Sequence, residues 1–180
     1  MISGKLRRED CLLLVIDLQE KLMPVIYQNE NIIKQTNILL KGMQILNVPI
    51  VVTEQYPNGL GNTCKEIELS ATQSVYEKIA FSCMKDEAIK ELLTRKRQVI
   101  ILGVEAHICV FKTALDLLIR GIEVHIVSDA VSSRTQENKT IALQRMQQSG
   151  AFIESTEMIL FQLLNTAGTD EFRAISKLIK

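Results

Sequence analysis

Residues 98–121 read QVIILGVEAHICVFKTALDLLIRG, and this stretch decides the fold class. Its apolar run up to Gly103 is typical of a strand that is buried on both faces. Residues 106–120 then have helical spacing and are followed by Gly121, a common residue just past the end of a helix. A buried strand that leads directly into a helix predicts an α/β fold.

The same alternation extends outward to both ends of the chain. Strands are expected over residues 11–17, 48–53, 98–103, 122–127 and 152–153. Helices are expected over residues 31–46, 85–95, 106–120, 135–149, 157–164 and 169–179. Residues 54–63 are rich in Pro, Asn and Gly and predict a loop, while residues 74–83 show no clear period and are expected to be irregular. Strands separated by helices predict a mostly parallel, doubly wound sheet with helices on each side.

Composition limits the class of protein. The chain has 180 residues, which suits a single domain spanning 1–180, and 47% of them are hydrophobic, which argues against disorder. The formal net charge is zero, so the basic excess of a nucleic-acid-binding protein is missing. Residues 1–10 are polar and unlike a secretion signal, and the longest apolar runs, 12–16 and 99–104, are too short to span a bilayer. We therefore expect a cytoplasmic protein, with an organellar matrix left open, and no nucleic-acid or membrane partner.

The cysteines are widely and irregularly spaced, at Cys11, Cys64, Cys83 and Cys109. The sequence contains no CxxC pair, so neither a structural zinc site nor a disulfide framework is expected. Reduced thiols in a reducing compartment are the simplest interpretation.

Doubly wound sheets bind ligands beyond the carboxyl ends of their strands, so the residues at those ends are the candidates for a site. The candidates at the expected strand ends are Asp17, Glu54, Gln55, Glu105, Cys109 and Asp129.

Two of these candidates have opposing interpretations. Asp17 ends the first apolar run. Its functional interpretation is a general acid or base, and its structural interpretation is a helix cap or an ion-pair partner. Cys109 falls near the first turn of the expected helix, where free N–H groups and the helix dipole favour a thiolate. Taken alone, Cys109 is more simply a buried structural cysteine.

Lys78 and the two histidines need context as well. A lone lysine is usually a surface charge, but beside a thiol and a carboxylate it would hold both as anions. His107 lies two residues before Cys109, and side chains two apart on a helix do not face each other. His125 falls inside a strand and is expected to be structural. The two histidines have no metal-ligand spacing.

Four segments in this order resemble the isochorismatase-like cysteine hydrolases, in particular the YcaC-like and ISOC-domain subgroup. They are Asp17-Leu-Gln19, the segment around Lys78, residues 103–114 (GVEAHICVFKTA) and residues 127–134 (VSDAVSSR). The similarity covers about residues 12–152. It implies a three-layer α/β/α fold around a six-stranded sheet.

The resemblance also implies a catalytic triad of Asp17, Lys78 and Cys109. In that mechanism Cys109 attacks the carbonyl of a small amide or related C–N substrate and forms a thioester. Asp17 carries the proton and Lys78 balances the charge. A cis peptide between Val104 and Glu105 is implied as well, with the N–H groups of Glu105 and Cys109 forming the oxyanion hole.

The implied substrate pocket and metal content follow from the same comparison. The expected pocket residues are Gln19, Gln55, Tyr56, Phe81, His107 and Ile108. The nicotinamidase branch carries an Asp-x-His…His metal site after its second strand, whereas this chain has TEQYPNGLG at residues 53–61. We therefore expect no metal, no other cofactor and no nicotinamidase activity.

Two functions other than hydrolysis are compatible with an α/β domain of this size. A catalytically silent scaffolding or interaction protein of the same fold is the main alternative. A nucleotide-binding domain is disfavoured because neither GxGxxG nor GxxxxGK[ST] follows any expected strand. The helix over residues 106–120 and the terminal helices carry more apolar positions than one face needs, which predicts a homo-oligomer.

Overall fold

The computed structural model describes residues 4–70 and 73–180. A six-stranded sheet forms its centre, in the order β3-β2-β1-β4-β5-β6, and every neighbouring pair is parallel. The strands are β1 Cys11–Ile16, β2 Ile50–Gln55, β3 Val75–Lys78, β4 Gln98–Gly103, β5 Glu123–Val131 and β6 Phe152–Glu154. The α-helices are α1 Asn29–Ile45, α2 Pro57–Leu60, α3 Glu87–Thr94, α4 Phe111–Ile119, α5 Gln136–Gln148, α6 Thr156–Leu163 and α7 Asp170–Ile179.

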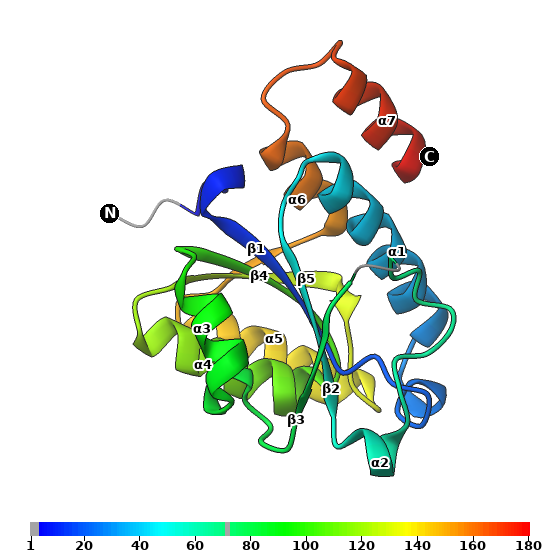
Figure 1. The fold of residues 1–180 in the computed structure, drawn as a ribbon, viewed down its shortest axis with the longest axis vertical. Helices are drawn as coiled ribbons and strands as arrows, with labels where there is room; N and C mark the ends of the chain where they lie inside the picture. Colours follow the sequence, from blue (N-terminus) through cyan, green and yellow to red (C-terminus); the bar gives the residue numbers. More distant parts are fainter. Residues whose placement is uncertain (1–3, 71–72) are drawn as a thin grey trace.

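Helices cover both faces of the sheet, so the predicted three-layer α/β/α architecture is confirmed (Figure 1). Helices α1, α6 and α7 pack together on one face, and α3, α4 and α5 lie on the other. Every residue of β1 and β4 is buried, as expected for central parallel strands covered on both sides.

Strands β1 and β4 lie at the point where the strand order reverses, because β2 and β3 extend the sheet to one side and β4 to β6 to the other. The chain leaves both central strands at the same edge of the sheet, with Asp17 after β1 and residues 104–109 after β4. This is the crevice in which doubly wound folds bind their ligands.

Gly103 allows the segment after β4 to approach the end of β1. A Cβ at this position would lie 2.1 Å from the main-chain oxygen of Ile16, and the φ of Gly103 is +121°. The N–H of Val104 then donates to the same Ile16 oxygen at 2.9 Å. Both the contact and the backbone conformation therefore require glycine.

Three expectations about secondary structure were wrong. Residues 75–78 form β3, a strand at the edge of the sheet that pairs with β2. Because this edge strand is partly exposed, it does not have the continuous apolar sequence of a buried strand. Strand β5 runs on to Val131, and its pairing with β4 shifts between Ile101 and Gly103. Residues 57–60, expected as loop, form the single turn α2, which begins at Pro57.

The helix expected over residues 106–120 is divided. Its first part, Ala106–Val110, is a π-helical turn, and the regular helix α4 begins at Phe111. The N–H of Val110 reaches back to the oxygen of Glu105 at 3.3 Å, which closes the wider turn. Such turns occur often at functional sites.

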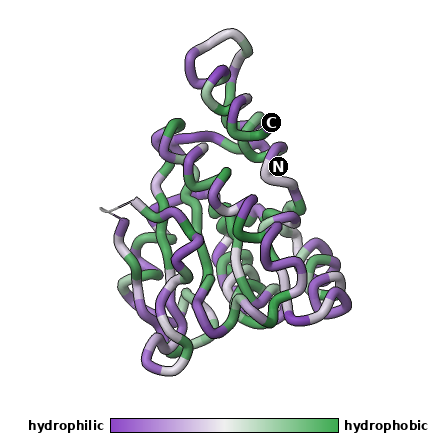
Figure 2. Tube along the Cα trace, turned by 90° about the vertical axis from the view of Figure 1, so that its right-hand side faces the viewer, coloured by the Kyte–Doolittle hydropathy of each residue, from purple (hydrophilic) through white to green (hydrophobic). Residues whose placement is uncertain are grey.

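The C-terminal helix α7 packs against α1. The loop before this helix projects from one end of the molecule, and hydrophobic and hydrophilic residues alternate along the helix (Figures 1 and 2). Ile175 is its fully buried residue, and Arg8 binds Glu171 through two side-chain hydrogen bonds. The segment before β1 is thus joined to α7.

The contact at Gly103 predicts that Gly103→Ala lowers the free energy of unfolding by at least about 3 kcal/mol, because the added carbon meets main-chain atoms that cannot move aside. The matched control is Gly121→Ala, where φ is +75° and, apart from its chain neighbours, no described residue has an atom within 4 Å of an added Cβ. That variant should lose only about 1–2 kcal/mol, the cost of a left-handed alanine. Urea unfolding measures both, and equal losses would contradict the role given to Gly103.

Candidate active site

Asp17 follows β1 in a left-handed backbone conformation, with φ +54°, which is uncommon for a residue with a side chain. Two main-chain hydrogen bonds hold it there. Its N–H donates to the oxygen of Thr53 at 3.1 Å, and its own oxygen accepts from Gln19 at 2.8 Å. The carboxylate is completely buried, so it needs partners within the protein.

Lys78, the last residue of β3, is the cationic partner of Asp17. Its Nζ lies 2.6 Å from Asp17 Oδ2, and neither side chain is exposed. The same Nζ donates to Gln55 Oε1 at 2.7 Å, and the Thr53 hydroxyl donates to Asp17 Oδ1 at 2.8 Å. Both carboxylate oxygens are therefore hydrogen-bonded, which a buried ion pair needs if it is not to destabilise the fold.

Cys109 lies in the π turn after β4 and is only 6% exposed. Burial raises the pKa of its thiol above the usual range, and the Asp17 carboxylate raises it further, while Lys78 lowers it. The three side chains therefore interact electrostatically in one buried cluster, where the resemblance implied a triad.

The expectation that the helix start favours a thiolate at Cys109 was wrong for the free protein. Burial and the Asp17 carboxylate raise the pKa of the thiol by more than Lys78 lowers it, so the net direction of the shift is upward. For Lys78, burial is the largest single influence and lowers the pKa, but Asp17, Cys83 and Cys109 together raise it by more, so the net shift is upward and the ammonium stays charged. The cluster at neutral pH is thus a thiol beside a carboxylate–ammonium pair.

A second thiol adjoins this cluster and was not singled out from the sequence. Cys83 is fully buried, and its N–H donates to Thr113 Oγ1 at 3.0 Å. Burial raises its pKa to about 11, although Lys78 lowers it. Thr113 lies four residues after Cys109, a spacing that places both on one side of the helix.

The amide of Gln19 is bound to main-chain atoms. Its Nε2 donates to the main-chain oxygens of Gln55 at 3.0 Å and Gly61 at 2.6 Å, and its Oε1 accepts from the N–H of Gln55 at 2.7 Å. The residue is completely buried. Gln19 thus joins the end of β1, β2 and the loop at Gly61, and its contact with substrate stays a prediction.

The other expected pocket residues are spread over several places. Gln55 is buried and donates to the oxygen of Ile79 at 2.6 Å, so it supports Lys78. Tyr56 is half-exposed and its ring covers Gly59. Phe81 is half-exposed in a surface groove of about 440 Å³ beside α4, with Lys112 Nζ 5.8 Å from its ring centre. Phe81 lies three residues after the end of β3, and its contact with substrate stays a prediction.

The segment around the π turn contains the remaining expected residues. The peptide bond between Val104 and Glu105 is cis. The Glu105 carboxylate accepts from the main-chain N–H and the Nε of Arg134, both at 3.1 Å. His107 Nδ1 lies 2.9 Å from the Ser133 hydroxyl, and Ile108 is half-buried against the core.

Two further strand residues have structural roles. Asp129 lies inside β5 rather than at its end, and its Oδ1 accepts from the N–H of Thr156 at 2.9 Å, which caps α6. His125 is buried, stacks on Phe152 and lies 2.8 Å from Glu154 Oε2.

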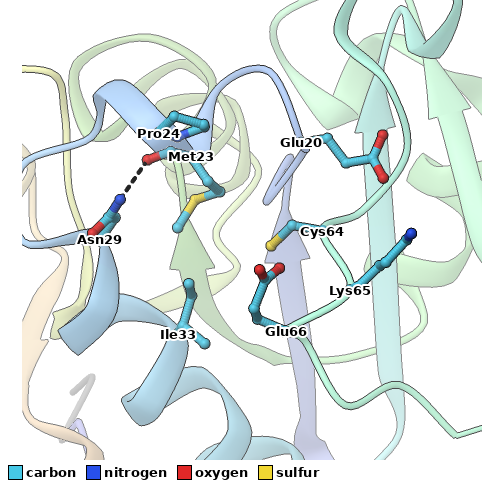
Figure 3. A pocket seen from close by; sticks show the side chains of 8 residues that line it. All are labelled: Glu20, Met23, Pro24, Asn29, Ile33, Cys64, Lys65 and Glu66. Atoms are coloured by element: carbon cyan, nitrogen blue, oxygen red, sulfur yellow. Dashed lines mark hydrogen bonds between the residues drawn. The ribbon is translucent and has the colours of Figure 1, made fainter.

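A separate cavity of about 440 Å³ lies between the start of α1 and the loop at residues 61–66 (Figure 3). Its lining residues are Glu20, Met23, Pro24, Asn29, Ile33, Cys64, Lys65 and Glu66. Burial and the nearby Glu66 raise the pKa of the Cys64 thiol. The cation among its lining residues, Lys65, is exposed, so this cavity is the weaker candidate for stabilising a thiolate.

Within residues 4–70 and 73–180, no group of three or more His, Cys, Asp or Glu side chains is placed to hold a metal ion. Over the same residues, none of the helices has the length and apolar character needed to cross a membrane.

Comparison with known proteins identifies relatives along nearly the whole chain. The isochorismatase domain family matches residues 11–158. The isochorismatase domain-containing protein 2 of Danio rerio is 43% identical over 178 residues, covering 98% of this chain and 90% of the relative. A secreted isochorismatase effector, Isc1, of Phytophthora sojae is also 43% identical, over 98% of this chain and 88% of the relative.

Solved structures agree with the sequence matches. A protein from Caenorhabditis elegans described as MAR1 ribonuclease superposes with a TM-score of 0.92 and 36% identity, covering 97% of this chain and 92% of that chain. YcaC from Escherichia coli, described as an octameric hydrolase of unknown specificity, has the same fold, with a TM-score of 0.86, 19% identity, and coverage of 99% and 91%.

The burial of the Asp17–Lys78 pair predicts that Lys78→Met lowers the free energy of unfolding by about 3–5 kcal/mol, because it leaves the carboxylate buried without its counter-ion. Adding Asp17→Asn to Lys78→Met should recover part of that loss. The control is Lys90→Met, which removes an exposed pair with Glu87 and should cost less than about 1 kcal/mol. Urea unfolding of the double-mutant cycle tests this, and a purely additive result would show that the pair is not coupled.

Proposed function

The chain belongs to the isochorismatase domain family of hydrolases, and on that premise we propose that it hydrolyses a small amide or related C–N substrate with Cys109 as nucleophile. The observation that supports this most is the buried set of Asp17, Lys78 and Cys109 at the switch point of the sheet. A carboxylate and an ammonium beside a thiol supply a proton acceptor and a charge that stabilises the resulting anion.

The first step is attack of the Cys109 sulfur on the substrate carbonyl. Because the pKa of the thiol is raised, the sulfur reacts well only if its proton leaves at the same time. Asp17 is the acceptor in our proposal. The proton then passes from Asp17 to the leaving nitrogen, the C–N bond breaks, and a thioester and an amine or ammonia are formed.

The second step consumes water. Asp17, again ionised, takes a proton from a water molecule that attacks the thioester carbonyl. The carbon–sulfur bond breaks, the sulfur regains a proton, and the acid product leaves. Lys78 balances the negative charge of Asp17, because its ammonium lies 2.6 Å from Asp17 Oδ2.

The developing oxyanion needs hydrogen-bond donors. We propose the N–H groups of Glu105 and Cys109, which lie at the start and within the π turn. His107 and Ile108, both half-buried, are proposed to border the substrate, with Tyr56 at the rim. No metal ion or other cofactor takes part in this mechanism.

The nucleophile is tested by comparing Cys109→Ala with Cys64→Ala on a panel of small primary amides and N-carbamoyl compounds, with ammonia release as the readout. Both thiols are 6% exposed, so Cys64→Ala is a matched control. Cys109→Ala should lose at least about 10³-fold in kcat/KM, and Cys64→Ala should stay close to the parent. Equal ammonia release by Cys109→Ala and the parent would rule out the mechanism.

Ribonuclease activity is a second candidate, because the C. elegans relative is described in those terms. The same variants are therefore also assayed on single-stranded RNA. The formal net charge of zero and the complete burial of His125 give little support for phosphodiester chemistry. RNA cleavage that depends on Cys109, without ammonia release from any amide, would favour this second candidate.

The alternative function, a catalytically silent scaffold, requires a surface that binds other protein chains. Exposed apolar side chains gather beside β3 and on α4, with Ile79 74%, Phe81 52% and Ile119 83% exposed. Such a patch is typical of an interaction surface, and we propose that it takes part in a homo-oligomer. We also propose a reducing, cytoplasmic location, because all four cysteines are free.

The oligomer proposal predicts that Ile119→Asp lowers the molar mass measured by size-exclusion chromatography with light scattering, because a carboxylate would be buried in the interface. Ile141→Asp, at a residue 55% exposed on α5, is the control and should leave the mass unchanged. A monomeric parent would contradict the proposal, as would an Ile119→Asp variant with unchanged mass.

A further inference from the structure

Thr53 contacts Asp17 through both its main chain and its side chain. This β2 residue is completely buried and pairs in register with Ile16 of β1 and Tyr76 of β3. Its main-chain oxygen accepts from the N–H of Asp17 at 3.1 Å, and its hydroxyl donates to Asp17 Oδ1 at 2.8 Å. One residue thus holds the left-handed backbone of Asp17 and the rotation of its carboxylate.

The two oxygens of Asp17 have chemically different partners. Oδ2 receives the Lys78 ammonium, which can only donate. Oδ1 receives a hydroxyl, which donates to a carboxylate but can rotate and accept from a carboxylic acid. Thr53 therefore has the chemistry to remain hydrogen-bonded to Asp17 in both protonation states.

We propose that Thr53 is a positioning residue that holds the Asp17 carboxylate in the orientation in which it accepts the Cys109 proton. This inference rests on the proposed function, in which Asp17 is the proton acceptor. It assigns a role in proton transfer to a neutral residue that does not react itself and that the sequence did not single out.

The surroundings of Asp17 determine what loss of the hydroxyl would change. The other ionisable groups that act in this cluster are Lys78, Cys109 and Cys83. Without the Thr53 hydroxyl, Oδ1 of Asp17 loses the hydrogen bond that fixes the rotation of the carboxylate. The rate at which Cys109 reacts should therefore fall when the hydroxyl is lost.

The test compares Thr53→Val, Thr53→Ser and Thr53→Ala with the parent. The valine variant keeps the shape of threonine without the hydroxyl, and the serine and alanine variants differ from each other by the hydroxyl alone. The matched control is Thr36→Val, since Thr36 is also fully buried but its hydroxyl has no hydrogen-bond partner among the residues that the structure describes. Thermal unfolding reports the fold of each variant.

The readout is the rate of iodoacetamide alkylation of Cys109 as a function of pH, followed by mass spectrometry of the peptide that contains it. Alkylation of Cys64 in the same sample is the internal reference. We expect Thr53→Val and Thr53→Ala to react about tenfold to a hundredfold more slowly at pH 7, the usual effect of losing a hydrogen bond to a charged group. Thr53→Ser and Thr36→Val should stay within about threefold of the parent.

The proposal is overturned if Thr53→Val alkylates as fast as the parent, or if Thr53→Ser is as slow as Thr53→Ala. A purely structural role for Thr53 would lower the unfolding temperature without changing the Cys109 rate. Should Thr53→Val fail to fold, the comparison of serine with alanine still decides. Failure of the proposed function is seen separately, as ammonia release by Cys109→Ala, and does not depend on these rates.

Discussion

The structure depends on one buried ion pair, between Asp17 and Lys78, whose charged atoms lie 2.6 Å apart with no exposed side-chain surface. Such a pair loses its hydration on folding and is tolerated only when further hydrogen bonds complete it. Thr53 and Gln55, both from β2, complete it here. The pair is therefore stable only when three strands, β1, β2 and β3, are in correct register. Cys109, which follows a fourth strand, β4, lies beside this pair.

The surrounding architecture serves to bring those strand ends together. The strand order places β1 and β4 side by side, at the point where the connections between strands change direction. Gly103 lets the chain at the end of β4 come into contact with the main chain of Ile16. The π turn that follows carries Cys109 toward the carboxylate. The Asp17 carboxylate has two opposing effects on the thiol: it raises the thiol pKa by repulsion, and in our proposal it accepts the thiol proton during attack. The proposed chemistry relies on the second effect.

Much of the fold was predictable because β1 and β4 are uninterrupted apolar runs, which are typical of central parallel strands. Strand β3 was not, because an edge strand with exposed Val75 and Glu77 has no such run. The grouping of Asp17, Lys78 and Cys109 followed from a family resemblance, since Lys78 alone has no distinguishing pattern. Thr53 and Cys83 were missed because their roles depend on strand register and packing, which sequence spacing does not encode. The state of the Cys109 thiol was predicted wrongly because sequence spacing does not show the burial and the neighbouring Asp17 carboxylate that raise its pKa.

In the proposed mechanism Asp17 acts on Cys109 as a base and not only as a repelling charge. The decisive measurement is site-resolved alkylation of Cys109 by iodoacetamide at pH 7, in the parent and in Asp17→Asn. We expect Asp17→Asn to react at least about 100-fold more slowly, the usual contribution of a positioned proton acceptor. An equal or faster rate in Asp17→Asn would contradict it, because removal of a merely repelling carboxylate would make the thiolate easier to form.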